Sequence, residues 1–374
     1  MPERRHEPPS PNATPDEAGL PVLHGRWLRE LLGGPIPKER NASCEACPMC
    51  SADAAPTDAR TAFFDASVKC CTWVPALPNF LAGSVLVDPN GAELGKRSVL
   101  DRLRARVGAS PLGLAPPPKH DVLYRESVVL HPEGNVFGRA RSLRCPHYEI
   151  DSGGCSIWAH RDGTCTTWFC KHVRGATGSR FWISVHGLLK EIERALSLWV
   201  LFELGLDARL VDQSFRRNAL RLGAEDLDAS VSDEAWAARW GAWVGREAEL
   251  YEAAAHKIAG LAWGDVARIA GPELTLRAAL ARDAHAKLLS NELPTRLRPA
   301  KLRVLPMVED SIRVETYSPY DAVDVSASIL ELAARFTSRP TSEVLAALQA
   351  EGIEDADELV RRLVDFALLE PIDR

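Results

Sequence analysis

The chain has 374 residues, more than one hydrophobic core usually serves, so two or three folded units are expected. Its formal net charge of −6 gives it no overall attraction to nucleic acids or anionic membranes. No apolar run approaches the roughly 20 residues that span a bilayer, and residues 1–12 lack the apolar stretch of a signal peptide. We therefore expect a cytoplasmic protein whose partners are proteins or peptides, with no nucleic acid and no membrane.

The N-terminal region divides into a polar tail and a short helix. Residues 1–19 combine five prolines with many charges, so we expect them to be disordered. Apolar side chains then recur at helical spacing before Gly33, Gly34 and Pro35. The pattern predicts an amphipathic helix that packs against the following cysteine-rich region.

All cysteines of the chain fall within residues 44–170. They are Cys44, Cys47, Cys50, Cys70, Cys71, Cys145, Cys155, Cys165 and Cys170. Two-residue spacers allow a tight turn to direct neighbouring sulfurs at a common centre. Because cytoplasmic thiols stay reduced, clustered cysteines are expected to bind metal in preference to forming disulfides. A nucleophilic thiol, such as Cys170 beside His172, is a further alternative.

Both an iron–sulfur cluster and Zn²⁺ remain open as the bound group. The Cys-x2-Cys-x2-Cys triplet and the prolines after Cys47 and Cys145 favour iron–sulfur, whereas zinc ribbons also use Cys-x2-Cys. We expect one set of ligands from residues 44–50 with one of the Cys70-Cys71 doublet, and a second set from residues 145–170. His147, His160 and His172 are close enough in sequence to replace a thiolate, although outer or surface positions are more typical of them.

One segment resembles a known family. Cys145-Pro146, Tyr148, Gly154-Cys155-Ser156-Ile157-Trp158, Arg161 and Cys165 are similar to the signature of the YkgJ-type cysteine-cluster proteins, which are described as zinc- or iron-chelating. The resemblance covers residues 44–172, and Cys70-Cys71 takes the place of the family's doublet. The chain departs from the signature in the nineteen residues between Cys50 and Cys70, in Trp158 for Tyr, and in Asp162-Gly163 after the Arg. Flagellin lysine N-methylases carry a similar cysteine pattern, which implies a cluster-dependent enzyme as an alternative.

The remaining sequence predicts mostly helices. Residues 84–87 and 122–130 are apolar runs typical of strands or buried extended segments. Helical periodicity extends from residue 181 to about 290, where Trp236, Trp240 and Trp243 are expected in the core. Residues 302–305 and 312–317 predict a strand pair around a turn at 309–311, followed by helices over 326–336, from 341, and over 356–368. This order is winged-helix-like and faintly resembles the PqqD-type peptide-binding module.

The sequence therefore predicts an α+β fold that is predominantly α. A metal-stapled, loop-rich cysteine domain is expected over residues 20–180, a helical domain over 181–300, and a small winged-helix-like domain over 301–374. The expected function is binding of iron–sulfur or zinc through the cysteines, with the other domains recognising a partner. The alternative is an enzyme that uses the cluster, such as a protein lysine N-methylase-like activity.

Overall fold

The computed structural model describes residues 19–39, 47, 49–50, 64–130, 136–207, 231–305, 311–337 and 339–372. The expected tail, apart from Gly19, lies outside the described residues, as do Cys44 and residues 309 and 310 of the expected turn. The described part is mostly helical with four small sheets, which confirms an α+β fold that is predominantly α. None of the described helices is long and apolar enough to cross a bilayer.

The helices of the first and larger part are α1 (Val22–Leu32), α2 (Asn79–Val87), α3 (Glu93–Arg104), α4 (Pro118–Leu130), α5 (Gly163–Thr167), α6 (Gly175–Glu203), α8 (Asp233–Trp240), α9 (Glu247–Ala259), α10 (Trp263–Ala270) and α11 (Pro272–Leu289). Its strands are β1 (Leu77–Pro78), β2 (Ala109–Ser110), β3 (Gly113–Leu114), β4 (Tyr148–Glu149) and β5 (Gly154–Cys155). The amphipathic helix expected before Gly33 is α1, and Gly33 ends it in a left-handed conformation with φ 63°.

The strands expected at 84–87 and 122–130 are wrong, because both segments are helical. α2 is buried on almost every side, and Gly83 lets the backbone of α9 approach so closely that a Cβ there would lie 1.8 Å from the carbonyl oxygen of Tyr251. A helix that is apolar all round has no amphipathic period, so its sequence cannot be told from a buried strand. α4 begins at Pro118, a position where the missing N–H costs no hydrogen bond.

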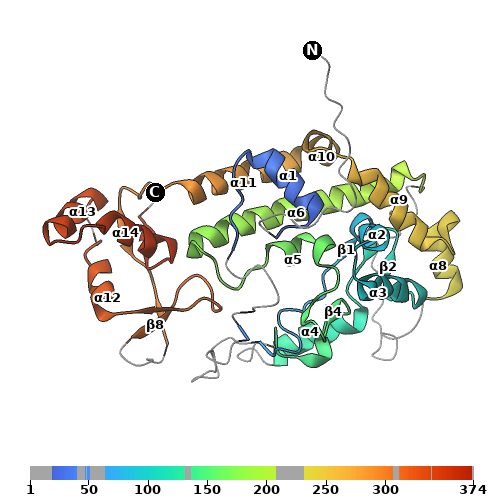
Figure 1. Cartoon of the computed structure of the whole chain (residues 1–374), viewed down its shortest axis with the longest axis horizontal. Helices are drawn as coiled ribbons and strands as arrows, with labels where there is room; N and C mark the ends of the chain where they lie inside the picture. The colour runs from blue at the N-terminus through green and yellow to red at the C-terminus, as the bar shows by residue number, and fades with distance from the viewer. Residues whose placement is uncertain are drawn as a thin grey trace, which may run out of the picture.

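α6 is the central helix of the larger part, and it packs along α11 and against α5, α9 and α10 (Figure 1). Its inward face is fully buried, as the helical periodicity predicted, and includes Phe181, Trp182, Val185, Leu188, Leu189 and Ile192. Trp236 and Trp240 are buried in the same core, which confirms them as core residues. This core runs from Leu20 to Leu288 and includes side chains on both sides of residue 180. The domain boundary expected at residue 180 stays a prediction.

The C-terminal part has its own hydrophobic core between Leu297 and Leu369 and lies at one end of α6 and α11 (Figure 1). Its strands are β6 (Leu297–Pro299), β7 (Arg303–Val304), β8 (Ile312–Glu315), β9 (Val323–Val325) and β10 (Leu369–Pro371), and its helices are α12 (Ala327–Ala333), α13 (Thr341–Ala350) and α14 (Ala356–Asp365). β7 pairs with β8 as the sequence predicted, with Val304 opposite Val314, and β9 adds a third strand. The winged-helix-like assignment stays a prediction.

Candidate metal centre

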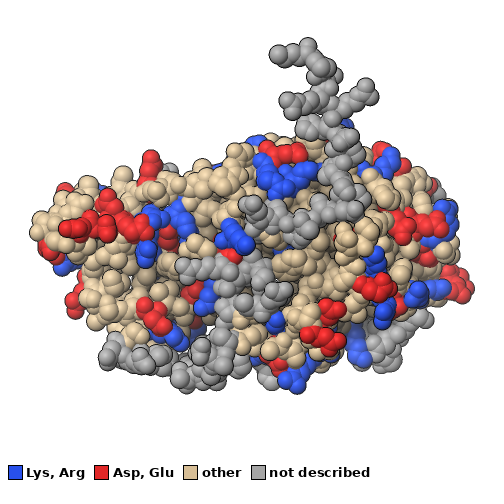
Figure 2. All heavy atoms as spheres, in the orientation of Figure 1, with Lys and Arg blue, Asp and Glu red and all other residues tan. Residues whose placement is uncertain are grey.

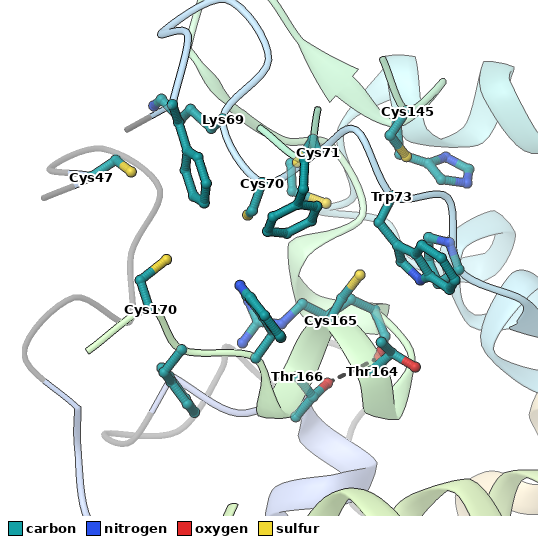
Figure 3. Close-up of a pocket in the computed structure, with 18 of the residues that line it drawn as sticks. Cys47, Lys69, Cys70, Cys71, Trp73, Cys145, Thr164, Cys165, Thr166 and Cys170 are labelled. Carbon is teal, nitrogen blue, oxygen red and sulfur yellow. Dashed lines mark hydrogen bonds between the residues drawn. The ribbon is translucent and has the colours of Figure 1, made fainter. Parts of the chain in front are cut away.

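A cavity of about 350 Å³ lies where the two cysteine stretches meet α5 (Figure 3). Both stretches contribute thiols to its wall, which contains Cys47, Cys70, Cys71, Cys145, Cys155, Cys165 and Cys170. Cys50 adjoins this wall, because its backbone N–H donates to the carbonyl oxygen of Cys47 at 3.1 Å and the two thiols also contact each other. The eight described cysteines form no disulfide. Cysteines as far apart in the chain as Cys47 and Cys170 therefore bring their thiols to one place.

Short turns and the β4–β5 hairpin position Cys70, Cys71, Cys145 and Cys155 at the cavity. Residues 66–72 form consecutive turns that contain the Cys70-Cys71 doublet. The backbone N–H of Cys145 donates to the carbonyl oxygen of Cys71 at 2.7 Å, which joins the two stretches directly. Cys155 lies on β5, opposite Tyr148 of β4, and the Tyr148 N–H donates to the carbonyl oxygen of Cys145 at 3.0 Å. Backbone hydrogen bonds therefore fix Cys71, Cys145 and Cys155 relative to one another.

Cys165 lies on α5, and two buried carboxylates together with Lys190 hold this helix in place. The carboxylate of Asp162 caps the helix by accepting from the N–H of Cys165 at 3.0 Å. Glu193 of α6 accepts from the N–H of Gly163, and Lys190 Nζ donates to both Asp162 and Glu193 at 3.2 and 2.7 Å. Lys190 compensates two buried carboxylates, and the three charged groups hold α5 against α6.

Burial keeps several of these thiols protonated. Burial and the thiol of Cys155 raise the pKa of Cys145 to about 12, and burial with Cys47 does the same for Cys50. The pKa of Cys165 is also raised, first by burial and then by Asp162 and neighbouring thiols. At neutral pH these groups lose their protons only when a metal ion replaces them.

Three cations face the thiols. A hydrogen bond from Cys71 lowers the pKa of Cys70, and the charges of Arg161 and Lys69 act in the same direction against burial. Arg161 is 4% exposed and lies over Trp158, with its guanidinium carbon 3.3 Å from the ring centre. Arg102 is also buried and places its charge near Cys145. Positive charge is thus available where metal-bound thiolates would add negative charge.

Of the three histidines near the cysteines, only His147 contributes to the described wall of the cavity. Its Nδ1 lies 2.7 Å from Ser98 Oγ, and burial lowers its pKa to about 3, so the ring is neutral at physiological pH. His160 is held by Asp88 at 2.7 Å, and His172 lies 3.4 Å from the hydroxyl of Tyr317. His160 and His172 are therefore held by these protein groups and do not belong to the described wall of the cavity.

Much of the remaining wall is aromatic, and the sequence alone did not identify most of it. Phe64, Phe137, Trp168 and Tyr320 form a cluster of rings with centroids 5.2–6.1 Å apart. Tyr320 belongs to the C-terminal part, so that part completes the cavity. No sequence signal identifies Tyr320, because the contact depends on how two separate cores pack together.

The thiols are suitable ligands for a soft metal, but they do not meet at a single point. Thiolates select zinc and iron–sulfur clusters among the metals common in proteins. Within the residues described, no group of three or more His, Cys, Asp or Glu side chains is close enough to hold a metal ion. The sulfurs instead lie around a cavity. The division of the cysteines between two metal sites stays a prediction.

Comparison with known proteins gives no relative. No protein-family model, no curated protein and no solved structure matches the chain.

Proposed function

We propose that the chain is a metal-binding protein that holds iron–sulfur or zinc through its clustered cysteines. The observation that carries the proposal is the cavity, because thiols from both cysteine stretches line one partly enclosed space, and Arg161, Lys69 and Arg102 place positive charge near them. Protonated thiols gain nothing from such neighbouring charges, whereas metal-bound thiolates are stabilised by them. The resemblance of residues 145–165 to the YkgJ-type signature supports the same function.

Iron–sulfur is the better match to the size of the cavity. Four thiolates around one zinc ion lie about 2.3 Å from it, which leaves almost no space between the sulfurs. The cavity here is about 350 Å³, on the order of ten times the share of liquid volume that one water molecule occupies. A multi-atom cluster uses such a space and is stabilised by cations and aromatic shielding, which also set its potential. Zinc bound at part of this wall is the alternative.

The helical and C-terminal parts recognise a protein or peptide partner in this proposal, and the protein acts in the cytoplasm. Figure 2 shows acidic and basic side chains interspersed over the described part of one face. Nucleic-acid-binding surfaces instead gather basic side chains in one patch. The face in view therefore favours a protein partner over a nucleic acid.

The test compares protein purified anaerobically from iron-replete cells with protein purified in air. We expect a brown anaerobic preparation with iron and acid-labile sulfide, bleached by dithionite and degraded by oxygen. Cys155→Ser, which removes one thiol from the wall, should reduce the bound metal. A colourless anaerobic preparation with stoichiometric zinc would establish the zinc alternative. A chain that contains no metal and takes none up during reconstitution would refute the proposal.

A cluster-dependent enzyme, with a protein lysine N-methylase-like activity as the example, is the second candidate. The observation that favours it is the aromatic side of the cavity, where Trp73 and Trp168 remain 39% and 42% exposed. A cavity with an accessible apolar wall beside a metal site can admit a substrate. Turnover of S-adenosylmethionine by the metal-loaded chain, lost in Cys155→Ser, would support this candidate, and its absence across lysine-bearing protein substrates would count against it.

A further inference from the structure

We propose that the two cysteine stretches interleave to form two adjacent metal sites. Cys71, Cys145, Cys155 and Cys165 form an inner site, and Cys47, Cys50, Cys70 and Cys170 form an outer site. This inference rests on the proposed metal-binding function and specifies its ligands. It differs from the division by stretch in two ways, since Cys170 joins the first stretch and Cys71 joins the second. Cys44 lies outside the described residues and is assigned to neither site.

The doublet lies between the two groups of thiols. In Figure 3, Cys47 and Cys170 face the cavity from one side, Cys145 and Cys165 lie on the other, and Cys70 and Cys71 lie between them. The thiols of Cys70 and Cys71 are hydrogen-bonded to each other. Consecutive side chains leave the backbone in different directions, so each member of a doublet can serve a different metal. The two sites would then share one wall, made by the doublet.

The inner site is joined by backbone contacts across the stretches. The hydrogen bond from the Cys145 N–H to the carbonyl oxygen of Cys71 places these two residues side by side at 2.7 Å. Besides burial, the thiols of Cys145 and Cys155 raise the pKa of both Cys71 and Cys165, and the thiol of Cys70 raises the pKa of Cys71, Cys145 and Cys165. Electrostatic influence falls with distance, so Cys145 and Cys155 lie near both Cys71 and Cys165, and the doublet borders this group.

The outer site has two thiols of its own, Cys47 and Cys50, and Cys70 is a neighbour of both sites. The thiols that act most strongly on Cys170 are Cys70, Cys47 and Cys50, and none of the inner cysteines is among its main influences. Burial raises the pKa of Cys50 most, and among the thiols Cys47 contributes more than Cys70. Cys170 follows α5 by three residues, whereas Cys165 lies within α5. The end of α5 therefore separates the last two cysteines of the second stretch.

The two sites differ in rigidity. The inner cysteines lie on the β4–β5 hairpin, on a helix capped by Asp162, and in a turn bonded to Cys145. The described backbone hydrogen bonds near Cys47 and Cys50 are the Cys50–Cys47 turn and the bond from Phe64 N–H to Met49. Preorganised ligands lose less conformational freedom on binding. The inner site is therefore expected to bind metal more tightly than the outer site.

The test uses Co²⁺ as the probe, added to the anaerobic, metal-free full chain, because its thiolate charge-transfer band counts sulfur ligands. Wild type is expected to bind two equivalents, and Cys165→Ser and Cys170→Ser are each expected to lose a different one. The double variant Cys145→Ser/Cys165→Ser should match Cys165→Ser alone, and Cys47→Ser/Cys170→Ser should match Cys170→Ser alone. The decisive variant is Cys145→Ser/Cys170→Ser, which should lose both equivalents. Circular dichroism confirms that each variant is folded, and Cys47→Ser tests the outer site without altering α5.

The outcomes separate this inference from the proposed function. If Cys145→Ser/Cys170→Ser keeps one equivalent at full thiolate intensity, the sites follow the two stretches and the interleaved arrangement is wrong. If wild type binds a single equivalent that every variant abolishes, the cysteines form one site, and metal binding stands without the division. If wild type binds no Co²⁺ and contains no iron or zinc as isolated, the metal-binding function itself fails.

Discussion

The side chain of Arg161 makes three interactions at the cavity and behind it. Its guanidinium stacks on Trp158, its Nη2 donates to the carbonyl oxygen of Gly19 at 2.7 Å, and its charge favours the thiolate form of Cys70. The last contact predicts a role in metal retention, because a buried cation offsets the charge that thiolates acquire when metal binds.

We predict that Arg161→Gln lowers the affinity for metal by about 10- to 100-fold, the usual effect of removing a partner next to the ligands. Competition with a chelator measures it. The control is Arg104→Gln, because Arg104 is 72% exposed and pairs with Asp101 on the surface of α3. Equal metal retention in the two variants would show that the Arg161 charge does not act on the site.

A second residue-scale prediction concerns acid. Burial lowers the pKa of His147 to about 3, below the ordinary value of 6.5, so the unfolded chain binds this proton more readily than the folded one. Stability from this group is therefore complete above pH 6.5 and is lost as the pH falls toward 3, by roughly one kcal/mol per pH unit. His147→Asn should flatten this dependence in urea unfolding of the metal-free chain between pH 7 and pH 5. His256→Asn, at an exposed position on α9, should keep the wild-type slope.

At the scale of elements, the success of sequence reasoning followed the periodicity of each segment. α6 and α11 were predictable because one face of each helix is buried and the other is not. α2 was mistaken for a strand because its environment, not its own pattern, makes it apolar on all sides. The cysteines were found as candidates from their spacing, whereas Phe64, Phe137 and Tyr320 were not, since their place in the cavity follows from packing between distant segments.

The contact between α2 and α9 supplies an element-scale prediction. Gly83→Ala would place a methyl group 1.8 Å from the carbonyl oxygen of Tyr251, so the two helices must separate. We expect the free energy of unfolding to fall by about 1–3 kcal/mol or more, as for other overpacked cores. The matched control is Gly264→Ala on α10, where a Cβ meets nothing within 4 Å and should be neutral or stabilise by up to about 1 kcal/mol. Urea unfolding measures the free energy of unfolding of both variants, and similar values for the two would contradict the close packing of α2 on α9.

At the scale of the whole molecule, the C-terminal part is joined to the larger part next to the cavity. Arg174, just before α6, binds Asp365 of α14 through two hydrogen bonds of 2.8 and 2.9 Å. Its Nη1 also donates to the carbonyl oxygens of Leu288 and Ser290, at the end of α11. Asp321 accepts from the hydroxyl of Tyr317 and, at 3.5 Å, from the N–H of His172, two residues after Cys170. Movement of the C-terminal part would therefore move the cavity wall.

Tyr320 allows this coupling to be tested, because its ring lies against Phe64, Phe137 and Trp168 at the side of the cavity. Removing the ring in Tyr320→Ala opens that side to water, and we expect faster removal of metal by a chelator and faster oxidative loss. Tyr320→Phe keeps the ring without the hydroxyl and should release metal at the wild-type rate. Stopped-flow mixing of each metal-loaded variant with a coloured chelator measures the rates. If Tyr320→Ala releases metal as slowly as Tyr320→Phe, the C-terminal part does not shield the site, and its packing there serves stability alone.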